Sequence, residues 1–525
     1  MERDECESFN RIYKEMPSLL DSIYWIESVI CAEFPALQTS STAIYYGDVN
    51  SENKSNDLNN YVVKVESADT ADSKELYIRI SNASALSKLY YKVLFNRNFD
   101  EKAFCYFVNA ICRFYNKIIP PLTDRLSDTI IESLNIISGK RLSDVLGKSQ
   151  SYNMPRSLRA RYVFATNMAF FDFVIGGGFV KDETRSFFRD LLSVLGARAY
   201  QTYEGKHRPF SCIIDGSIIV KEAEQSCYIR LLDFLESKES CLFANGYWTY
   251  FRISKNGYIL EYVNDNFRGL SSYDPQLVVF APIQYSRLAS ECKGENIGVV
   301  LCADGEILVF KNRALILSKR KGTWHYHDQS AIVDIIKTGI ERCDAVTEQK
   351  ETRKLANCIF ASIIDVSFAH SGGCIGIVQE GERIGQDELK EQNICIKTKR
   401  STDENSSSIV RSTLLTCIIP HSSIDSRTEN MSISFADTPR EIQMELLALD
   451  GATVINQNGK YLAVGYILNS TLQSENGGGR DAAARTLGSK GLGIKISEDG
   501  EVKLYCKKHN DGADALHVSE IKIFI

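Results

Sequence analysis

The chain has 525 residues, which is enough for two to four domains of roughly 150 residues each. Hydrophobic residues make up 44% of it and charged residues 24%, the balance of an ordinary globular protein and not of a disordered one. The net charge of -6 excludes a protein that coats nucleic acid through a uniformly basic surface. A local basic pocket for a phosphorylated ligand is still allowed.

The fifteen cysteines are dispersed and match no metal-binding or redox motif. No two of them form a CxxC pair, and no Cys/His group has the spacing of a zinc finger. Several lie in apolar runs, such as Cys302 and Cys374, so we expect buried thiols in a reducing cytosol. The first residues resemble no signal peptide, and the longest apolar stretch, 355–378, is interrupted by Asp365 and His370. We therefore expect a cytoplasmic protein with no membrane span.

Residues 1–150 mix strand and helix patterns, and we expect them to form an α+β region. Strands are expected at 61–67 and 76–81, where apolar residues alternate, and helices at 101–117 and 126–139. The dipeptide Pro120-Pro121 separates the two helices. A polar stretch ending at Pro155 marks the expected boundary with the next region.

Residues 151–345 are expected to form a second α+β region that senses a signal or regulates the rest. Helices are expected at 156–175, 185–197 and 331–343, and strands at 211–220 and within 298–328. Asn256-Gly257 should form a type I′ turn, with positive φ at both residues. His325 and His327 have no third metal ligand nearby, so we expect an exposed strand end there.

Residues 346–525 form the third expected domain, and they carry the densest chemical signals. A helix at 355–368 should lead into a short buried strand at 371–378. Thr438 is expected to cap a helix that begins at Pro439, with Glu441 as its capping-box partner. That helix ends near Asp450-Gly451-Ala452. Strands at 453–456 and 461–468 follow, joined by a hairpin turn at Asn458-Gly459.

A glycine-rich segment, Gly477-Gly478-Gly479-Arg480, comes directly before the helical run 481–489. Glycines that lead into a helix present unpaired N–H groups at the positive end of the helix dipole, which suits a phosphate. Arg480 adds a planar group of donors for phosphate oxygens. Strands at 492–497 and 501–505 follow, joined by the turn 498–500.

Three segments, in this order and spacing, are similar to the diadenylate cyclase (DAC) domain. They are LALDGATVIN (447–456), GGGRDAAARTLGSKG (477–491) and GIKISEDGEVKLY (493–505), and GGCIGIV (372–378) resembles the opening strand of that family. The resemblance covers the last third of the chain. It implies an α/β domain, with a mixed sheet wrapped by helices, that takes ATP and a divalent metal, Mg²⁺ or Mn²⁺.

The resemblance also implies roles for individual residues. Asp450 matches the catalytic, metal-associated aspartate of a DGA motif, and Ser497 and Glu498 match a Ser-Glu pair near the nucleotide, where Glu498 is the second catalytic candidate. The nucleotide-binding set that the resemblance implies is Gly451, Ala452, Leu468, Gly477, Gly478, Gly479, Arg480 and Ser497.

The chain departs from the family pattern at three positions. The family has a histidine and a second arginine directly after the arginine that matches Arg480, whereas this chain has Asp481 and Ala482. The histidine often found before the DGA motif is Leu449 here. Arg485, on the same expected helix, is a candidate to point toward the same end.

Two functions follow as hypotheses. The first is a sensor-regulated nucleotidyltransferase that joins two nucleoside triphosphates, such as ATP, into a cyclic dinucleotide such as c-di-AMP. The alternative is a degenerate DAC-like module that binds a nucleotide without synthesis. The architecture resembles sensor-cyclase proteins of bacterial conflict systems, which implies antiviral defence, an effector ligand or protein of unknown identity, and a homo-oligomer whose DAC-like domains meet face to face.

Overall fold

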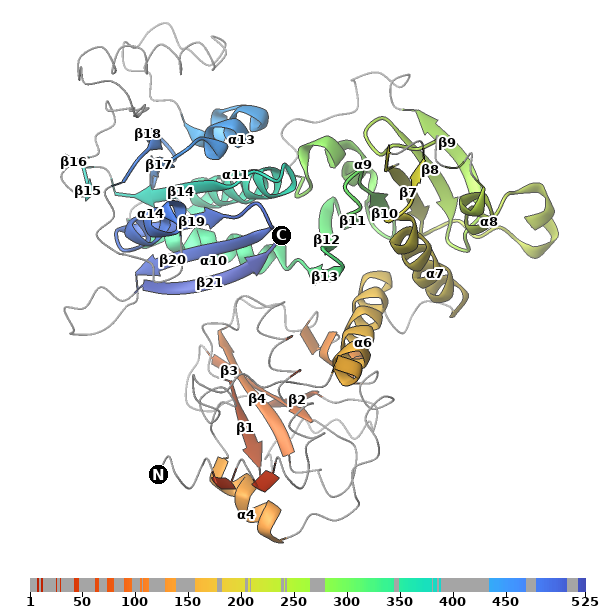
Figure 1. Ribbon diagram of the computed structural model, residues 1–525, viewed down its shortest axis with the longest axis horizontal. Coiled ribbons are helices and arrows are strands. Elements are labelled where there is room, and N and C mark those ends of the chain that lie inside the picture. The colour runs from red at the N-terminus through yellow and green to blue at the C-terminus, as the bar shows by residue number, and fades with distance from the viewer. Residues whose placement is uncertain are drawn as a thin grey trace, which may run out of the picture. The chain divides into compact units, whose positions relative to one another are not determined.

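The computed structural model describes a mixed α/β protein (Figure 1). The described residues are 7–8, 11–12, 25, 29, 42–46, 62–65, 73–79, 89–96, 104–105, 107–112, 128–137, 156–176, 182–203, 206–207, 209–237, 240, 243–264, 279–343, 349–379, 381–384, 387–388, 434–468, 478–507 and 518–525. The chain divides into two compact units, Met1–Val194 and Leu195–Ile525. Among the helices described, none combines the length and the apolar character that crossing a membrane requires.

The first unit contains a four-stranded antiparallel sheet in the order β1-β4-β3-β2. Its elements are β1 (Thr42–Tyr46), β2 (Val62–Val65), β3 (Ser73–Arg79), β4 (Leu89–Asn96), α4 (Asp128–Ile137), α6 (Arg156–Ile175) and most of α7 (Asp182–Arg198). The expected strands and helices of this region are therefore confirmed where the structure describes them. Phe107 and Phe170 stack with ring centroids 4.9 Å apart and contribute to a buried aromatic core.

The second unit contains a seven-stranded sheet in the order β13-β12-β11-β10-β7-β8-β9. Its strands are β7 (Phe210–Asp215), β8 (Thr249–Ser254), β9 (Ile259–Asn264), β10 (Ile297–Leu301), β11 (Ile307–Lys311), β12 (Ala314–Arg320) and β13 (Thr323–Tyr326). Only β7 and β8 run parallel; the other neighbours are antiparallel, and all of these except β7 with β10 follow one another directly in the chain. The short helices are α8 (Leu231–Glu236) and α9 (Ser286–Glu291).

The same unit contains a six-stranded mixed sheet in the order β18-β17-β14-β19-β20-β21. Its strands are β14 (Gly373–Val378), β17 (Ala452–Asn456), β18 (Tyr461–Tyr466), β19 (Gly491–Ile496), β20 (Glu501–Lys507) and β21 (Val518–Phe524). The central strand β14 pairs parallel with β17 and antiparallel with β19. Two-stranded ribbons are formed by β5 (Thr202–Tyr203) with β6 (Lys206–His207) and by β15 (Arg383–Ile384) with β16 (Asp387–Glu388).

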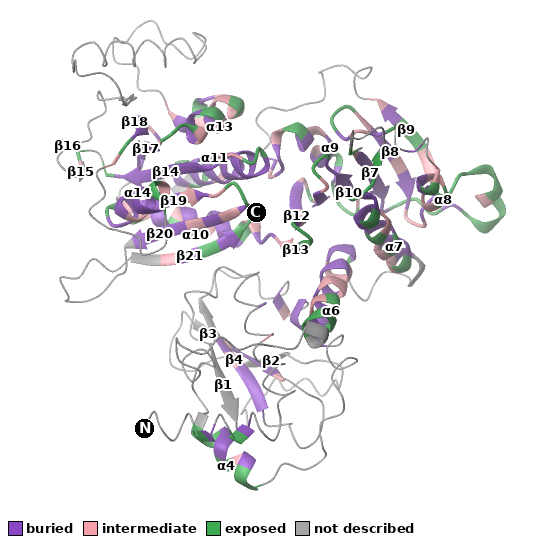
Figure 2. Cartoon of the chain, in the orientation of Figure 1, coloured by how far each residue is buried: buried purple, intermediate pink, exposed green. Residues whose placement is uncertain are grey.

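Helices cover both faces of the six-stranded sheet, so its central strands are buried on each side (Figure 2). The helices are α10 (Gln329–Glu341), α11 (Gln349–Phe368), α13 (Arg440–Ala448) and α14 (Gly479–Gly488). Alternate residues of a strand face opposite sides. On β19, Leu492, Ile494 and Ile496 join the core that includes α10 and α11, so Lys495 faces the side of α14.

One hydrophobic core connects the two sheets of the second unit. It joins residues of β10 and β11 to residues of α10, α11 and β19. Arg440 of α13 adds a polar connection, because its guanidinium donates to the main-chain oxygens of Val279 (3.0 Å) and Ala281. The sequence predicts boundaries at 150 and 345, whereas the compact units meet between Val194 and Leu195. The shared core explains why 195–345 belongs to the same unit as the C-terminal sheet.

The turn and cap predictions need correction. Asn256 does not have a positive φ; Gly257 alone does (90°), and its N–H donates to the Ser254 oxygen (3.0 Å), so a three-residue loop replaces the type I′ turn. Asn458-Gly459 follows the same pattern. Thr438 does not cap α13: Pro439 occupies the N-cap, and the Thr438 hydroxyl donates to the Ser434 oxygen (2.9 Å). The helix has no capping box, because its N-cap residue is a proline and has no side-chain oxygen to accept a hydrogen bond.

His327 is buried, so the expectation of an exposed strand end is wrong at this residue. It is 3% exposed, and its Nε2 lies 2.9 Å from the Ser318 hydroxyl. Trp324 of β13 is also buried, and His325 stacks on Phe524 of β21 with centroids 5.0 Å apart. The strand end is covered because β21, a strand that the sequence patterns missed, lies against it. Burial lowers the pKa of His327 to about 3.

We expect His327 to make folding stability fall as the pH drops. Its folded pKa is below the ordinary value of about 6.5, so the unfolded chain binds the extra proton and the stabilising contribution is lost as pH falls from 6.5 toward 3. Between pH 7 and 5 the loss is about 2 kcal/mol. Urea unfolding of His327→Gln at both pH values should show a smaller fall than wild type. An unchanged fall would contradict the assignment, and the exposed His207→Gln is the control.

Candidate functional site

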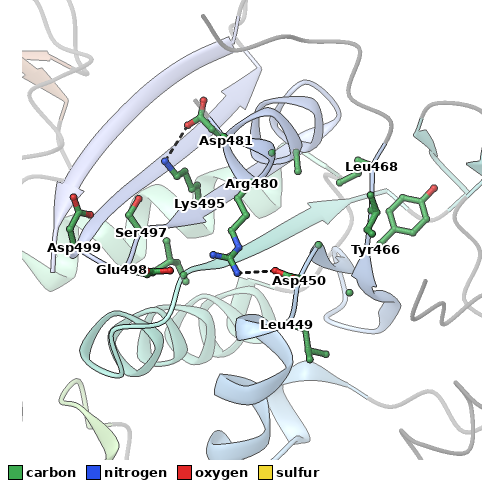
Figure 3. Close-up of a pocket in the computed structure, with 18 residues that line it drawn as sticks. Leu449, Asp450, Tyr466, Leu468, Arg480, Asp481, Lys495, Ser497, Glu498 and Asp499 are labelled. Carbon is green, nitrogen blue, oxygen red and sulfur yellow. Dashed lines mark hydrogen bonds and ion pairs between the residues drawn. The ribbon is translucent and has the colours of Figure 1, made fainter. Parts of the chain in front are cut away.

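A pocket of about 1060 Å³ opens at one edge of the six-stranded sheet (Figure 3). Since β14 is parallel to β17 and antiparallel to β19, the first residues of β14 and β17 and the last residues of β19 meet at this edge. The end of β18 and the N-terminus of α14 also reach it. The lining residues are Gly372, Leu449, Asp450, Gly451, Gly465, Tyr466, Ile467, Leu468, Gly478, Gly479, Arg480, Asp481, Ala483, Lys495, Ile496, Ser497, Glu498 and Asp499.

Most of the site residues expected from sequence line this one pocket. They are Asp450, Gly451, Leu468, Gly478, Gly479, Arg480, Ser497 and Glu498. Ala452 does not line it, because it is the first residue of β17 and is buried. Gly477 lies outside the described residues. Segments separated in sequence are therefore brought together by the pairing of β17, β14 and β19.

Asp450 lies at the mouth of the pocket. Its side chain is fully exposed, and one carboxylate oxygen lies 3.4 Å from Arg480 Nη2. The next residue, Gly451, has a φ of 100°, and a Cβ there would lie 2.6 Å from the main chain of Gly465. Only glycine fits this close crossing. The turn therefore holds the Asp450 carboxylate outside the sheet and facing the pocket.

Arg480 crosses the pocket from the first turn of α14. Gly478 is the N-cap of that helix, and among the described residues no side chain caps it. The guanidinium passes directly over Gly372, where an added Cβ would lie 2.2 Å from Arg480 Nη1. Gly372 therefore leaves open the space that the Arg480 guanidinium occupies in this conformation. The N-terminus of α14, the positive end of the helix dipole, and the guanidinium lie beside the same space.

The carboxylate of Asp481 is buried beside the pocket. Its side chain is 2% exposed and accepts hydrogen bonds from Tyr505 Oη (2.8 Å) and Arg485 Nε (2.9 Å). Burial alone would raise the pKa of Asp481, but these hydrogen bonds outweigh burial and the pKa lies below its ordinary value. Arg485 also pairs with Glu520 (2.9 Å) and does not line the pocket, so it does not point toward the same end as Arg480.

Lys495 and Asp499 line the pocket and were not singled out from sequence. A signal for Lys495 was present, because it is the one charged residue in the apolar strand GLGIKI. Asp499 lies in the turn 498–500, which the sequence predicts. Both acidic residues of this turn, and not Glu498 alone, line the pocket. Leu449, Tyr466 and Ile467 are apolar members of the lining, and Tyr466 is itself buried in the hydrophobic core.

The charge of the pocket bears on whether a metal fits. Four carboxylates line it, whereas the cations are Arg480 and Lys495. A polyphosphate would be repelled by this excess of negative charge unless a divalent cation came with it. Mg²⁺ is typically held by one or two carboxylates together with substrate phosphates. Asp450, exposed and facing the pocket, has the donor chemistry for that role.

A second group, Asp304, Glu306 and His370, brings ligand atoms within 4.8 Å of one another. Arg320 lies inside this group, 2.6 Å from Glu306 Oε1 and 3.3 Å from His370 Nδ1. Because Arg320 can only donate, Nδ1 must accept, and Nε2 carries the proton that it donates to Asp304 (2.8 Å). In this arrangement the group is an ion-paired cluster around Arg320, and its donor set is not specific for a metal, because exposed acidic groups are common without one.

No protein-family model matches the sequence, and no curated protein matches it.

Proposed function

We propose that this protein is a regulated nucleotidyltransferase that joins two nucleoside triphosphates, with ATP as the preferred substrate, into a cyclic dinucleotide. The observation that carries the proposal is the meeting of Asp450, Arg480 and Glu498 around one pocket, which is also lined by the N-terminus of α14 and by apolar residues. These are the residues that resemble the DAC motifs, and a DAC-like fold for 346–525 is part of the same proposal.

The chemistry divides into two equal steps. In each, the 3′-hydroxyl oxygen of one nucleotide bonds to the α-phosphorus of the other, and the bond from that phosphorus to pyrophosphate breaks. The hydroxyl proton passes to a carboxylate, for which the exposed Glu498 at the rim is the candidate. Arg480 and the N–H groups at the start of α14 hold phosphate oxygens and stabilise the charge that develops. Two triphosphates thus become one cyclic dinucleotide and two pyrophosphates.

Asp450 would hold the divalent cation, Mg²⁺ or Mn²⁺. Such an ion, when bound, neutralises phosphate charge and makes the attacking hydroxyl more acidic. Asp450 contributes by position: its carboxylate is exposed, and its ion pair with Arg480 is a long contact of 3.4 Å. Nucleotide binding would draw Arg480 toward phosphate oxygens and leave Asp450 available for the cation.

The direct test is to incubate the purified full chain with each nucleoside triphosphate and Mn²⁺ and to identify the products by mass spectrometry. A cyclic dinucleotide together with pyrophosphate supports the proposal. Binding of a nucleotide without any product, under conditions that span pH and metal, would contradict synthesis.

The alternative is a module that binds a nucleotide and does not join two. The observation that favours it is Asp481, a carboxylate placed in the first turn of α14 where the family has a basic residue. Its negative charge lies close to the expected phosphates and weakens the positive field of the helix N-terminus. The same incubation separates the two functions, because only the enzyme releases pyrophosphate.

We expect Gly372→Ala to weaken ATP binding about tenfold, the cost of losing one charge-assisted contact. The new methyl would occupy the space that Arg480 Nη1 now fills, so the guanidinium must move. Calorimetry should show this loss in the wild-type background. In an Arg480→Ala background the methyl has room, and Gly372→Ala should change the affinity by no more than about twofold. Equal losses in both backgrounds would contradict the contact.

Assembly follows from the same proposal. One DAC-type pocket holds one nucleotide, so a cyclic product needs two pockets face to face, which two chains related by a two-fold axis provide. Residues before 346 would govern this meeting in response to an effector. We expect the rate per chain to rise with protein concentration until paired chains dominate, as measured by kinetics across dilution with light scattering. A concentration-independent rate from a monomer would contradict the two-fold arrangement.

A further inference from the structure

Lys495 and Lys503 form a natural pair for comparison. They are directly opposite each other on the neighbouring strands β19 and β20. Their ammonium groups lie 3.8 Å and 4.0 Å from the same oxygen of Asp481, and their side chains are 20% and 16% exposed. Only Lys495 lines the pocket (Figure 3). The two lysines share Asp481 and differ in two respects: Lys503 also pairs with Glu501 (3.8 Å) and Glu520 (3.5 Å), and only Lys495 reaches the candidate site.

Asp481 does not depend on Lys495. Its Oδ1 accepts the hydroxyl of Tyr505 at 2.8 Å and its Oδ2 accepts Nε of Arg485 at 2.9 Å. The contact with Lys495, at 3.8 Å, is longer than a hydrogen bond. Lys495 can therefore turn toward a ligand without leaving a buried carboxylate unpaired. The cost of that movement is small, because Lys503 and Arg485 remain beside Asp481.

Arg480 and Lys495 lie on different elements and line the same pocket, the first on α14 and the second on β19. A nucleoside triphosphate carries several negative charges along a chain of phosphates. Two cations on separate elements can contact different phosphates of that chain, whereas one guanidinium cannot reach all of them. Lysine suits this task because its flexible stem carries a compact point charge.

We propose that Lys495 is the second phosphate-binding cation of this pocket, and that its ligand is the polyphosphate chain of a nucleotide. The DAC motif has a second arginine at the position of Ala482, and Lys495 would supply the positive charge that this alanine lacks. In the absence of a ligand the ammonium group lies 3.8 Å from Asp481, and a phosphate oxygen would replace that carboxylate as its partner. That the ligand is a nucleotide rests on the proposed function. That Lys495 binds a phosphate rests on the pocket geometry.

The test compares Lys495→Gln with the matched control Lys503→Gln in the full chain. Calorimetry uses two probes, ATP with Mg²⁺ and inorganic tripolyphosphate with Mg²⁺, and thermal melting checks the fold of each variant. We expect Lys495→Gln to bind both probes about tenfold more weakly, with a smaller dependence on salt. Lys503→Gln should bind both as wild type does, and Lys495→Arg should restore most of the affinity.

The outcomes separate the two claims. If wild type binds ATP and Lys495→Gln binds it equally well, the inference is wrong and the proposed function stands. If Lys503→Gln loses as much affinity as Lys495→Gln, the effect is one of general charge and the inference is wrong. If wild type binds tripolyphosphate through Lys495 but does not bind ATP, the inference holds and the proposed function fails. If wild type binds neither probe, the inference is overturned.

Discussion

Asp450→Asn is expected to lower product formation at least a hundredfold while the protein stays folded. An amide is a much weaker ligand for a divalent cation than a carboxylate, and a bound cation supplies several kcal/mol of charge stabilisation, where about 1.4 kcal/mol is tenfold in rate. The fold should survive because the Asp450 side chain is fully exposed and its ion pair with Arg480 is long. Pyrophosphate release, measured with saturating ATP and Mn²⁺, reports the loss.

Asp437→Asn is the matched control for this prediction. Asp437 is also an exposed aspartate of the second unit, and its carboxylate lies 3.3 Å from Lys354, close to the 3.4 Å between Asp450 and Arg480. It does not line the pocket. Both variants should melt at the wild-type temperature, and only Asp450→Asn should lose activity. Near wild-type rates in Asp450→Asn would remove that residue from the chemistry.

Arg440→Met is expected to destabilise the second unit by about 3–5 kcal/mol, a large part of the 5–15 kcal/mol that typically holds a domain together. The guanidinium pairs with Asp365, whose side chain is fully buried, and donates to the main chain of Val279 and Ala281. Without it, the carboxylate keeps the N–H of Ile283 (2.8 Å) and loses its counter-charge. Equilibrium unfolding in urea at pH 7 measures the difference.

The pH dependence gives this prediction a second readout. Burial raises the pKa of Asp365 to about 6, although Arg440 opposes the rise. A raised folded pKa means that the contribution of this group is present below about 4 and is lost as pH rises through 6. In Arg440→Met the pKa rises further, so protonation at pH 5 should relieve much of the deficit seen at pH 7.

Two further variants make the interpretation specific. The pair Asp365→Leu and Arg440→Met together should be more stable than Arg440→Met alone, since no buried charge is then left unpaired. Arg353→Met removes an exposed ion pair with Asp334 (3.4 Å) and should cost no more than about 1 kcal/mol. If Arg440→Met lowered the free energy of unfolding by no more than Arg353→Met does, the buried ion pair would not be important for the stability of the second unit.

The sequence by itself determined most of the regular elements and the residues that meet at the pocket. Helix α6 occupies residues 156–175 as expected, and α10, β14 and β19 lie within a few residues of their expected positions. Periodicity of apolar residues is a property of the local chain, so it can be recognised without knowing the neighbours. The motif residues around Asp450 and Arg480 lie at the ends of such elements, and the strand order then brings the ends together.

Tertiary structure alone decided which partners the side chains of those elements contact. Thr438 is in a capping-box pattern, yet its hydroxyl bonds to Ser434. Lys495 and Lys503 have the same kind of strand neighbours in sequence, yet only Lys495 lines the pocket; its strand β19 lies beside β14, whereas Lys503 is one strand further on β20. Arg440 contacts Val279, which is 161 residues away, and no local pattern specifies such a partner. The physical reason is that burial and pairing depend on segments distant in the chain, whereas periodicity depends on neighbours within a turn or a strand.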